Sequence, residues 1–260
     1  MLKKENLILN YHSILTDDDF RNSPSDDIYS IRHTEFKMQV DFLIRQQIPV
    51  VSLRSLENVQ SLPDFSVSLT FDDGNDSDYE LAYPNLVGNG LTAALFIPAN
   101  KSNLSWGKIK EMHENGFEIG SHGLNHVSFT DISARNIVAE LTISKDTIEQ
   151  NIGDRIDFLA FPFGRYNWKI ISAAIDSGYT GFFTTDKRIN ALPAESNLFH
   201  RWSIRHNVDI TEFEQIICNK SYRRKQMVRS RVAGIGKRVL GRRISDGLNV
   251  RFNSKIKPHD

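Results

Sequence analysis

The sequence predicts an α/β protein of about seven parallel strands, for which a closed or nearly closed (β/α) barrel fits better than an open sheet. Short apolar segments alternate with helical patterns along the 260 residues, as expected where helices join parallel strands. Polar clusters follow several of these segments, where the active-site residues of such barrels lie. Apolar residues make up 40% and charged residues 25% of the chain, which is typical of a globular protein with one large core.

Each predicted strand is a short apolar segment, and each predicted helix repeats apolar residues at three- and four-residue spacing. The strands are expected at residues 7–11, 49–53, 67–71, 91–97, 117–120, 157–161, 182–184 and 202–204. The helices are expected at residues 34–44, 84–87, 106–115, 133–152, 168–175 and 211–217. Residues 16–30 are rich in Asp and contain Pro24, which favours a long surface loop.

A pair of acidic residues, Asp72 and Asp73, directly follows the apolar strand 67–71. Two neighbouring carboxylates repel each other, and burying them without a partner is costly. A cation would relieve this cost, since one carboxylate can bind a metal while its neighbour stays free to act as a base. The alternative is a polar turn at a strand end, because Asp-Asp pairs also occur at residues 17–18 and 26–27.

Two histidines, His122 and His126, stand four residues apart after the predicted strand 117–120. Residues at this spacing lie on one face of a helical turn, so both imidazoles can reach one ion. One Asp with two His leaves a coordination position for water, as in catalytic zinc sites. Co²⁺ and Ni²⁺ also suit these ligands. A surface histidine pair is the alternative interpretation.

Two further strand ends carry candidate catalytic groups. Phe161-Pro162-Phe163-Gly164 follows a strand, and the amides of such a sharp turn can face a developing oxyanion. His12 follows the first strand and is a candidate general acid. Taken alone, each of these two segments is better explained by a structural role, an ordinary strand-to-loop exit for the first and a structural histidine for the second.

Thr-Phe-Asp-Asp-Gly, Ser-His-x-x-x-His and Phe-Pro-Phe-Gly, taken in this order, resemble the polysaccharide deacetylase family, also called the NodB-homology domain or carbohydrate esterase family four. The resemblance covers about residues 7–217 and implies a distorted (β/α) barrel. It implies that Asp72 is the catalytic base and that the Phe163 amide contributes to the oxyanion hole. It also implies that Asp73, His122 and His126 bind one divalent metal ion, with Zn²⁺ expected.

The sequence departs from the family pattern at two places. Many members carry an arginine, which orients the base, at the position of Ala160. Arg165, Arg201 and Arg205 are candidates to replace it. Many members also place the acid histidine in a Leu-x-His motif late in the domain, which this chain lacks. Asn-Tyr-His12-Ser instead resembles a circularly permuted branch with poly-N-acetylglucosamine deacetylases, which implies that His12 is the acid.

These features predict a metal-dependent hydrolase that removes an N-acetyl group from an amino sugar of a polysaccharide or a lipid-linked glycan. A carbohydrate O-acetyl esterase and a deformylase on the same scaffold are alternatives. Ala160 also leaves open a non-catalytic sugar-binding protein with a degenerate site. A base beside a metal site argues against that last alternative, because a binding module does not need one.

The net charge of zero hides an asymmetry that divides the chain. Residues 220–260 hold 13 Lys and Arg against 2 Asp and Glu, so the remainder has 19 basic and 30 acidic residues. We therefore expect a catalytic domain at 1–219 and a basic tail at 220–260, partly helical or disordered. The basic amphipathic pattern of the tail is compatible with contact with an anionic membrane and equally with a solvated or disordered tail. Nucleic-acid binding is not expected, because the tail lacks an aromatic stacking pattern.

The sequence also carries expectations about cellular location. Cys218 is the only cysteine, so no disulfide can form within the chain, which fits a reducing compartment. No apolar segment resembles a signal peptide or a membrane span. We expect a cytoplasmic protein with peripheral contact at the inner face of the membrane.

Overall fold

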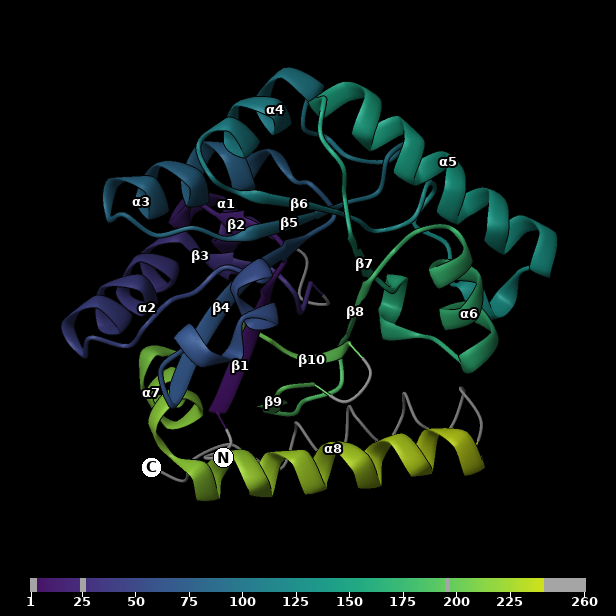
Figure 1. Ribbon diagram of the computed structural model, residues 1–260. Helices are drawn as coiled ribbons and strands as arrows, with labels where there is room; N and C mark the ends of the chain where they lie inside the picture. Colours follow the sequence, from purple (N-terminus) through teal and green to yellow (C-terminus); the bar gives the residue numbers. More distant parts are fainter. Residues whose placement is uncertain (1–3, 24–26, 195–196, 241–260) are drawn as a thin grey trace.

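A barrel of parallel strands forms the centre of the computed structural model, which describes residues 4–23, 27–194 and 197–240 (Figure 1). Among these residues, seven parallel strands follow one another around the barrel, and pairing between the last and the first closes it. In order they are β1 (Lys4–Tyr11), β4 (Phe65–Asp72), β5 (Ala94–Ile97), β6 (Glu118–Ser121), β7 (Phe158–Ala160), β8 (Gly181–Thr184) and β10 (Leu198–Ser203). The predicted distorted (β/α) barrel is confirmed.

Helices cover the outside of the barrel (Figure 1). They are α2 (His33–Arg45), α3 (Tyr83–Gly88), α4 (Trp106–Glu114), α5 (Ala134–Ile152), α6 (Trp168–Asp176) and α7 (Ile210–Cys218). Ser105, Ser133 and Asn167 begin three of these helices, each accepting a hydrogen bond from an amide of the first turn, which satisfies a donor that the helix leaves unpaired.

The apolar residues of each strand divide between two cores, because successive side chains point to opposite faces. One core lies between strands and helices and includes Leu7, Leu9 and Tyr11 of β1. The other fills the barrel and includes Ile8 of the same strand and the ring of Phe96. Polar side chains share the barrel with this core, since the buried Asn6 of β1 donates to Ser66 and Ser68 of β4.

Three sequence predictions were wrong. Residues 49–53 form no strand, and only an isolated bridge joins Val50 to Val67. The expected loop at 16–30 contains the helix α1 (Asp17–Asn22), begun by the Thr16 side chain, and residues 24–26 lie outside the described part. Three short strands were not predicted: β2 (Ile14–Leu15), β3 (Ile31–Arg32) and β9 (Asn190–Leu192), which pairs antiparallel with β1.

The helix α8 (Lys220–Leu240) begins at the end of the barrel opposite the mouth (Figure 1). Lys220 pairs with Glu5 at the start of β1, and the buried Arg223 lies over the ring of Phe65 at the start of β4. Arg223 also donates to two carbonyls at the end of α7. The first turns of the predicted basic tail thus pack on the barrel, while residues 241–260 of that tail lie outside the described part.

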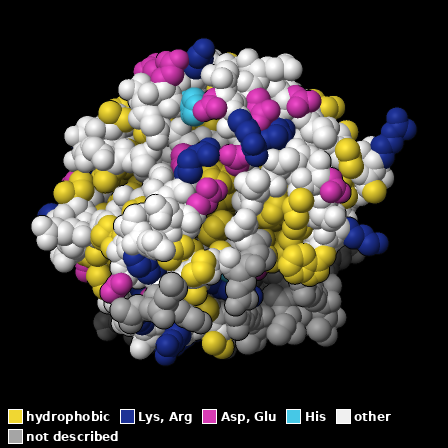
Figure 2. Space-filling model, viewed as in Figure 1, with side chains coloured by type: hydrophobic (Ala, Val, Ile, Leu, Met, Phe, Trp, Pro, Cys, Tyr) yellow, Lys and Arg dark blue, Asp and Glu magenta, His cyan; other side chains and the backbone are white. Residues whose placement is uncertain are grey.

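The face seen in Figure 2 carries acidic and basic side chains interspersed, with apolar side chains between them. Among the described residues, no helix combines the length and the apolar character needed to cross a bilayer.

Candidate active site

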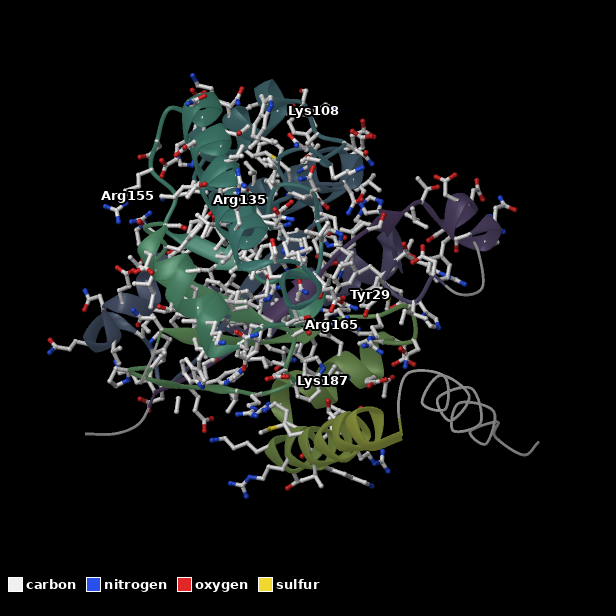
Figure 3. All side chains as sticks on the ribbon, turned by 90° about the vertical axis from the view of Figure 1, so that its right-hand side faces the viewer. Tyr29, Lys108, Arg135, Arg155, Arg165 and Lys187 are labelled. Carbon is white, nitrogen blue, oxygen red and sulfur yellow. The ribbon has the colours of Figure 1, made fainter. Side chains whose placement is uncertain are left out.

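The barrel brings the predicted site residues to one mouth. Asp72 ends β4, His122 follows β6, and the turn η5 (Pro162–Gly164) with Phe163 follows β7. His12 follows β1, which pairs with β4. Residues separated by up to 151 positions thus meet because the carboxyl ends of parallel strands lie at one edge. Figure 3 looks at the side of the molecule where Tyr29, Arg165 and Lys187, from loops of this mouth, lie near the centre of the view.

Asp73, His122 and His126 form a cluster in which one ligand atom of each residue lies within 4.8 Å of the others. The Nε2 atoms of His126 and His122 lie 3.2 Å and 3.7 Å from Asp73 Oδ1. That oxygen is buried and has no hydrogen-bond partner among the described residues. A buried carboxylate oxygen without a donor is costly, and facing two imidazole nitrogens it fits a divalent cation.

The ring of His122 is oriented by its second nitrogen. Nδ1 lies 2.8 Å from the carbonyl oxygen of Ala160 and donates to it, so the lone pair of Nε2 faces the cluster, as is usual for metal-binding histidines. Burial lowers the pKa of His122, although the charges of Asp72 and Asp73 oppose this shift. Burial thus favours the neutral imidazole, which is the form that binds metal.

Glu140, on α5, fixes the loop that carries both histidines. Its buried carboxylate accepts hydrogen bonds from the amides of Leu124 and Asn125 at 2.8 and 3.0 Å and from the Asn125 side chain at 2.7 Å. These bonds satisfy amides that the turn leaves unpaired. Glu140 therefore sets the separation of His122 and His126.

Backbone strain collects at the same cluster. Asp73, His126 and Phe163 all adopt left-handed conformations, with φ of 78°, 52° and 59°. Such residues cost about 1–3 kcal/mol each and persist only where the surroundings hold them, often at functional sites.

A hollow of about 230 Å³ opens beside this cluster and is lined by Asp73, His126 and Asn103, among others.

Asp72 is held by Arg201 from β10. The guanidinium donates to both carboxylate oxygens at 2.6 and 2.8 Å, and both side chains are buried. Burial alone would raise the pKa of Asp72, but the charge and the hydrogen bonds of Arg201 oppose it, and the pKa lies below its usual range. Asn10 also donates to Asp72 at 3.1 Å. Asp72 is therefore an ionised carboxylate of defined orientation.

Of the three arginines that the sequence offered to orient Asp72, the structure selects Arg201. Arg165 instead pairs with Asp131 at 3.2 Å, and Arg205 lies over the ring of Tyr29. Arg201 lies over the ring of Phe96, and its strand β10 is separated from β4 only by β1. The sequence offered no signal for this choice, because only closure of the barrel brings β10 near β4.

His12 lies beside the two carboxylates, and its ring packs against Tyr29 at 4.6 Å between centroids. Burial lowers the pKa of His12, whereas Asp72 and Asp73 act to raise it. Its Nδ1 is buried and makes no hydrogen bond within the described part of the chain. His12 is thus a largely enclosed imidazole at the mouth.

The turn η5 places Phe163 beside the cluster of Asp73, His122 and His126, called the metal-type cluster below. Its ring is 59% exposed and lies 4.8 Å from the ring of His126. Gly164 makes this turn possible, because its φ is +65° and a Cβ there would lie 1.9 Å from the Thr185 hydroxyl. The turn η5 therefore holds the Phe163 side chain against one of the two clustered histidines.

Sequence reasoning missed Glu140, Asn10 and Asp78. Asp78 is buried in the segment after Asp73, accepts from the Asn75 amide at 2.9 Å, and has its pKa raised well above the usual value by burial. Glu140 directly precedes Leu141, an apolar residue of the predicted helix. An acidic residue at such a position is a sequence signal for a buried acid with a specific partner, since acids are rarely buried without one.

Comparison with known proteins finds one matching family model. Residues 60–182 match the model described as polysaccharide deacetylase. The predicted family resemblance is confirmed. A polysaccharide deacetylase-like segment therefore includes Asp72, Asp73, both clustered histidines and Phe163.

Two curated relatives extend this likeness. The chain is 31% identical to YxkH of Bacillus subtilis over 124 residues, which are 46% of this chain and 44% of that protein. It is 28% identical over 194 residues to the poly-beta-1,6-N-acetyl-D-glucosamine N-deacetylase of Staphylococcus aureus, covering 63% of this chain and 67% of the relative. The chain thus spans less than half the length of the Bacillus relative.

Solved structures share the fold. The Streptococcus pyogenes deacetylase PplD in complex with acetate has a TM-score of 0.73 at 23% identity and covers 83% of this chain and 99% of its own. IcaB from Ammonifex degensii has a TM-score of 0.69 at 21% identity, covering 85% and 97%. These likenesses support the barrel seen here.

Proposed function

We propose that this chain is a metal-dependent deacetylase that hydrolyses the N-acetyl group of an amino sugar in a glycan. The observation that carries the proposal is the Asp73–His122–His126 cluster beside an ionised, oriented Asp72. The family match and the N-deacetylase among the relatives support the reaction and the substrate class.

The residues present fit a divalent metal ion, with one carboxylate and two imidazoles around an unpartnered oxygen. Zn²⁺ is the expected ion, and Co²⁺ or Ni²⁺ would also suit these donors. Bound there, the ion would polarise the acyl carbonyl and lower the pKa of water towards about 7.

The protein groups then divide the proton transfers. Asp72 accepts a proton from the attacking water, whose oxygen bonds to the acyl carbon. The amide of Phe163 donates to the oxygen that becomes negative. His12, in its protonated form, gives a proton to the sugar nitrogen as the carbon–nitrogen bond breaks, which releases acetate and a free amine. Arg201 positions Asp72 and keeps it ionised.

Two substitutions test these roles. Asp72→Asn should abolish acetate release from N-acetylglucosamine oligomers while metal content stays near one ion per chain. His126→Ala should lose both, because it removes a ligand. Metal analysis and acetate release, each with and without a chelator and on protein verified as folded by circular dichroism, measure these effects.

Full activity of Asp72→Asn would contradict the role of the base. Wild-type activity that survives complete metal removal would contradict metal dependence. Release of acetate from O-acetylated but not from N-acetylated sugars would favour the esterase alternative, and formate release from an N-formyl sugar would favour the deformylase. Metal and glycan binding without turnover on any of these would favour a sugar-binding protein.

We further propose that the chain is cytoplasmic and contacts the inner face of the membrane through its basic tail. Arg224, Lys225 and Arg229 of α8 are exposed, as is the apolar Val228, and cations near anionic lipid contribute about 1 kcal/mol each. Reversing these three charges to Glu should abolish flotation with vesicles that contain anionic phospholipid. Equal flotation of both proteins would remove this proposal.

A further inference from the structure

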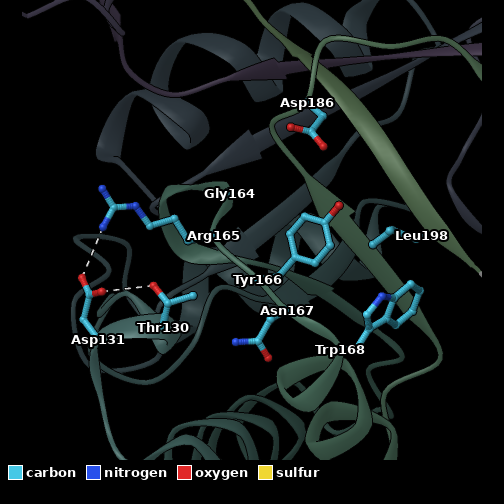
Figure 4. Close-up of a pocket in the computed structure, with 9 residues that line it drawn as sticks. All are labelled: Thr130, Asp131, Gly164, Arg165, Tyr166, Asn167, Trp168, Asp186 and Leu198. Atoms are coloured by element: carbon cyan, nitrogen blue, oxygen red, sulfur yellow. Dashed lines mark hydrogen bonds and ion pairs between the residues drawn. The ribbon is translucent and has the colours of Figure 1, made fainter. Parts of the chain in front are cut away.

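Two features border the mouth of the barrel beside the metal-type cluster. One is a hollow of about 700 Å³ next to the turn η5, lined by Arg165, Trp168 and Asp186, among others (Figure 4). The other is the packing of Tyr29, from the loop before β3, on the ring of His12. Neither of these two rings belongs to the described lining of the hollow. The contact between Tyr29 and His12 is therefore a separate feature of the mouth.

His12 lacks the hydrogen bond that usually orients a catalytic histidine. Its Nδ1 is buried and has no hydrogen-bond partner among the residues that the structure describes. In most such histidines, a bond from the second ring nitrogen fixes the tautomer and the angle of the ring. His122 has this bond, since its Nδ1 donates to the Ala160 carbonyl. The orientation of the His12 ring therefore depends on packing.

Tyr29 supplies that packing. Its ring centroid lies 4.6 Å from the centroid of the His12 ring, and the two planes are inclined by 39°. This separation is within the range of favourable aromatic pairs. The face of a tyrosine ring also attracts a protonated imidazole, which is the form that gives up a proton. The Tyr29 hydroxyl makes no hydrogen bond to any described residue, so the ring alone carries the contact.

The Tyr29 ring is itself held in place. The guanidinium carbon of Arg205 lies 5.3 Å from its centroid. Asp27 accepts hydrogen bonds from the amides of Tyr29 and of the next residue at 3.3 and 3.1 Å. The His206 amide donates to the Ile28 carbonyl at 3.3 Å. The segment after β10 thus fixes the loop that lies against His12.

We propose that Tyr29 is a positioning residue, which holds the His12 ring at the angle needed to protonate the leaving nitrogen, and that Arg205 holds Tyr29. The inference rests on the proposed function, in which His12 is the acid. A merely structural role of Tyr29 would weaken every reaction of the site equally. A role through His12 affects only a reaction whose leaving group needs a proton.

Two substrates separate these roles. N-acetylglucosamine oligomers release an amine that must be protonated, whereas 4-nitrophenyl acetate releases a weakly basic phenolate that leaves without a proton. Tyr29→Ala should lower kcat on the oligomers about tenfold and leave KM and the hydrolysis of 4-nitrophenyl acetate unchanged. Tyr29→Phe keeps the ring and should restore kcat. Arg205→Met should lower kcat on the oligomers by a smaller factor.

Phe20→Ala is the matched control. Phe20 belongs to α1 in the same segment and has the guanidinium of Arg32 4.8 Å from its centroid, so the variant removes a similar pair and should match the wild type on both substrates. In a double-variant cycle, Tyr29→Ala should cause no further loss in a His12→Ala protein, because it acts through His12. Equal losses of Tyr29→Ala on both substrates, or a further loss in the double variant, would overturn the inference.

The contact can also be measured without turnover. In nuclear magnetic resonance spectra, Tyr29→Ala should shift the ring protons of His12, because the neighbouring ring current is lost. The ring protons of His113, which pairs with Asp154, should not shift. Unchanged His12 signals would overturn the positioning role. A wild type that hydrolyses 4-nitrophenyl acetate but no N-acetyl sugar would instead contradict the proposed reaction, while a shift of the His12 signals would still assign Tyr29 as the support of that ring.

Discussion

At the scale of single residues, Asp72 and Arg201 depend on each other. Both are buried, and the guanidinium contacts both carboxylate oxygens. Removing one member of such a pair leaves an unpaired buried charge, which costs about 3–5 kcal/mol. The same pairing that orients a base for chemistry therefore makes this position sensitive for folding.

Arg201→Met is expected to lower the free energy of unfolding at pH 7 by about 3–5 kcal/mol. In the wild type the lowered pKa of Asp72 stabilises the fold above a pH of about 4, and this contribution is lost as the pH falls through the folded pKa. Without Arg201, burial raises that pKa, so the deficit should be larger at pH 7 than at pH 5. Urea denaturation at both values measures it.

Arg165→Met is the matched control for Arg201→Met. Its partner Asp131 is 56% exposed, and exposed ion pairs contribute about 0–1 kcal/mol. If the free energy of unfolding fell equally in the two variants, the buried Asp72–Arg201 pair would stabilise the fold no more than the exposed pair does.

Glu140 acts on the metal-type cluster without touching it. Glu140→Gln replaces one acceptor oxygen by a donor, so either the Asn125 side chain or the amides of Leu124 and Asn125 lose their acceptor. We expect affinity for Zn²⁺ to fall about 10–100-fold, as for other residues that orient ligands. Competition with a chelator measures the dissociation constant. Asp146→Asn, an exposed acid on the same helix, should leave it unchanged.

At the scale of elements, short turns at the carboxyl ends of strands set the geometry of the mouth. Three of the helices around the barrel begin with a side-chain cap, Ser105, Ser133 or Asn167, of a residue type that sequence reasoning recognises. The turns differ, since Asp73, His126 and Phe163 take conformations that few residues other than glycine adopt. No sequence pattern indicated them.

Gly164→Ala is expected to destabilise the protein more than Gly90→Ala. Both glycines have positive φ, but a Cβ at Gly90 meets nothing within 4 Å, whereas one at Gly164 overlaps Thr185. The Gly90 variant should lose about 1–2 kcal/mol from backbone strain alone. Thermal unfolding compares the two, and only Gly164→Ala should also reduce acetate release. Similar decreases in stability for both variants would show that the Thr185 side chain can move away from the new methyl group at no cost in stability.

At the scale of the whole molecule, the barrel separates the candidate site from the basic helix. The cluster lies at the carboxyl ends of the strands, and α8 starts at their amino ends. A membrane bound by the exposed cations of α8 would thus lie towards the end of the barrel remote from the mouth. This arrangement agrees with a glycan that reaches the mouth from solution.

Metal should stabilise the whole fold, because the three ligands come from two strand ends and meet only in the folded chain. Zn²⁺ at 1,000 times its dissociation constant should add about 4 kcal/mol, or a rise of about ten degrees in the midpoint of thermal unfolding for a chain of this size. Differential scanning calorimetry with and without metal measures it. An equal rise for His126→Ala would mean that the ion binds elsewhere.

Local patterns in the chain were enough to predict parallel strands joined by helices, and to place Asp72, Asp73, the two histidines and His12 just after strands, because each of these positions depends on the order of residues near one strand end. Which arginine holds Asp72, how Glu140 ties down the histidine loop, and that a hollow with Trp168 adjoins the site were decided only by tertiary structure. These features join residues from different strands and loops, and only closure of the barrel sets the distances between them.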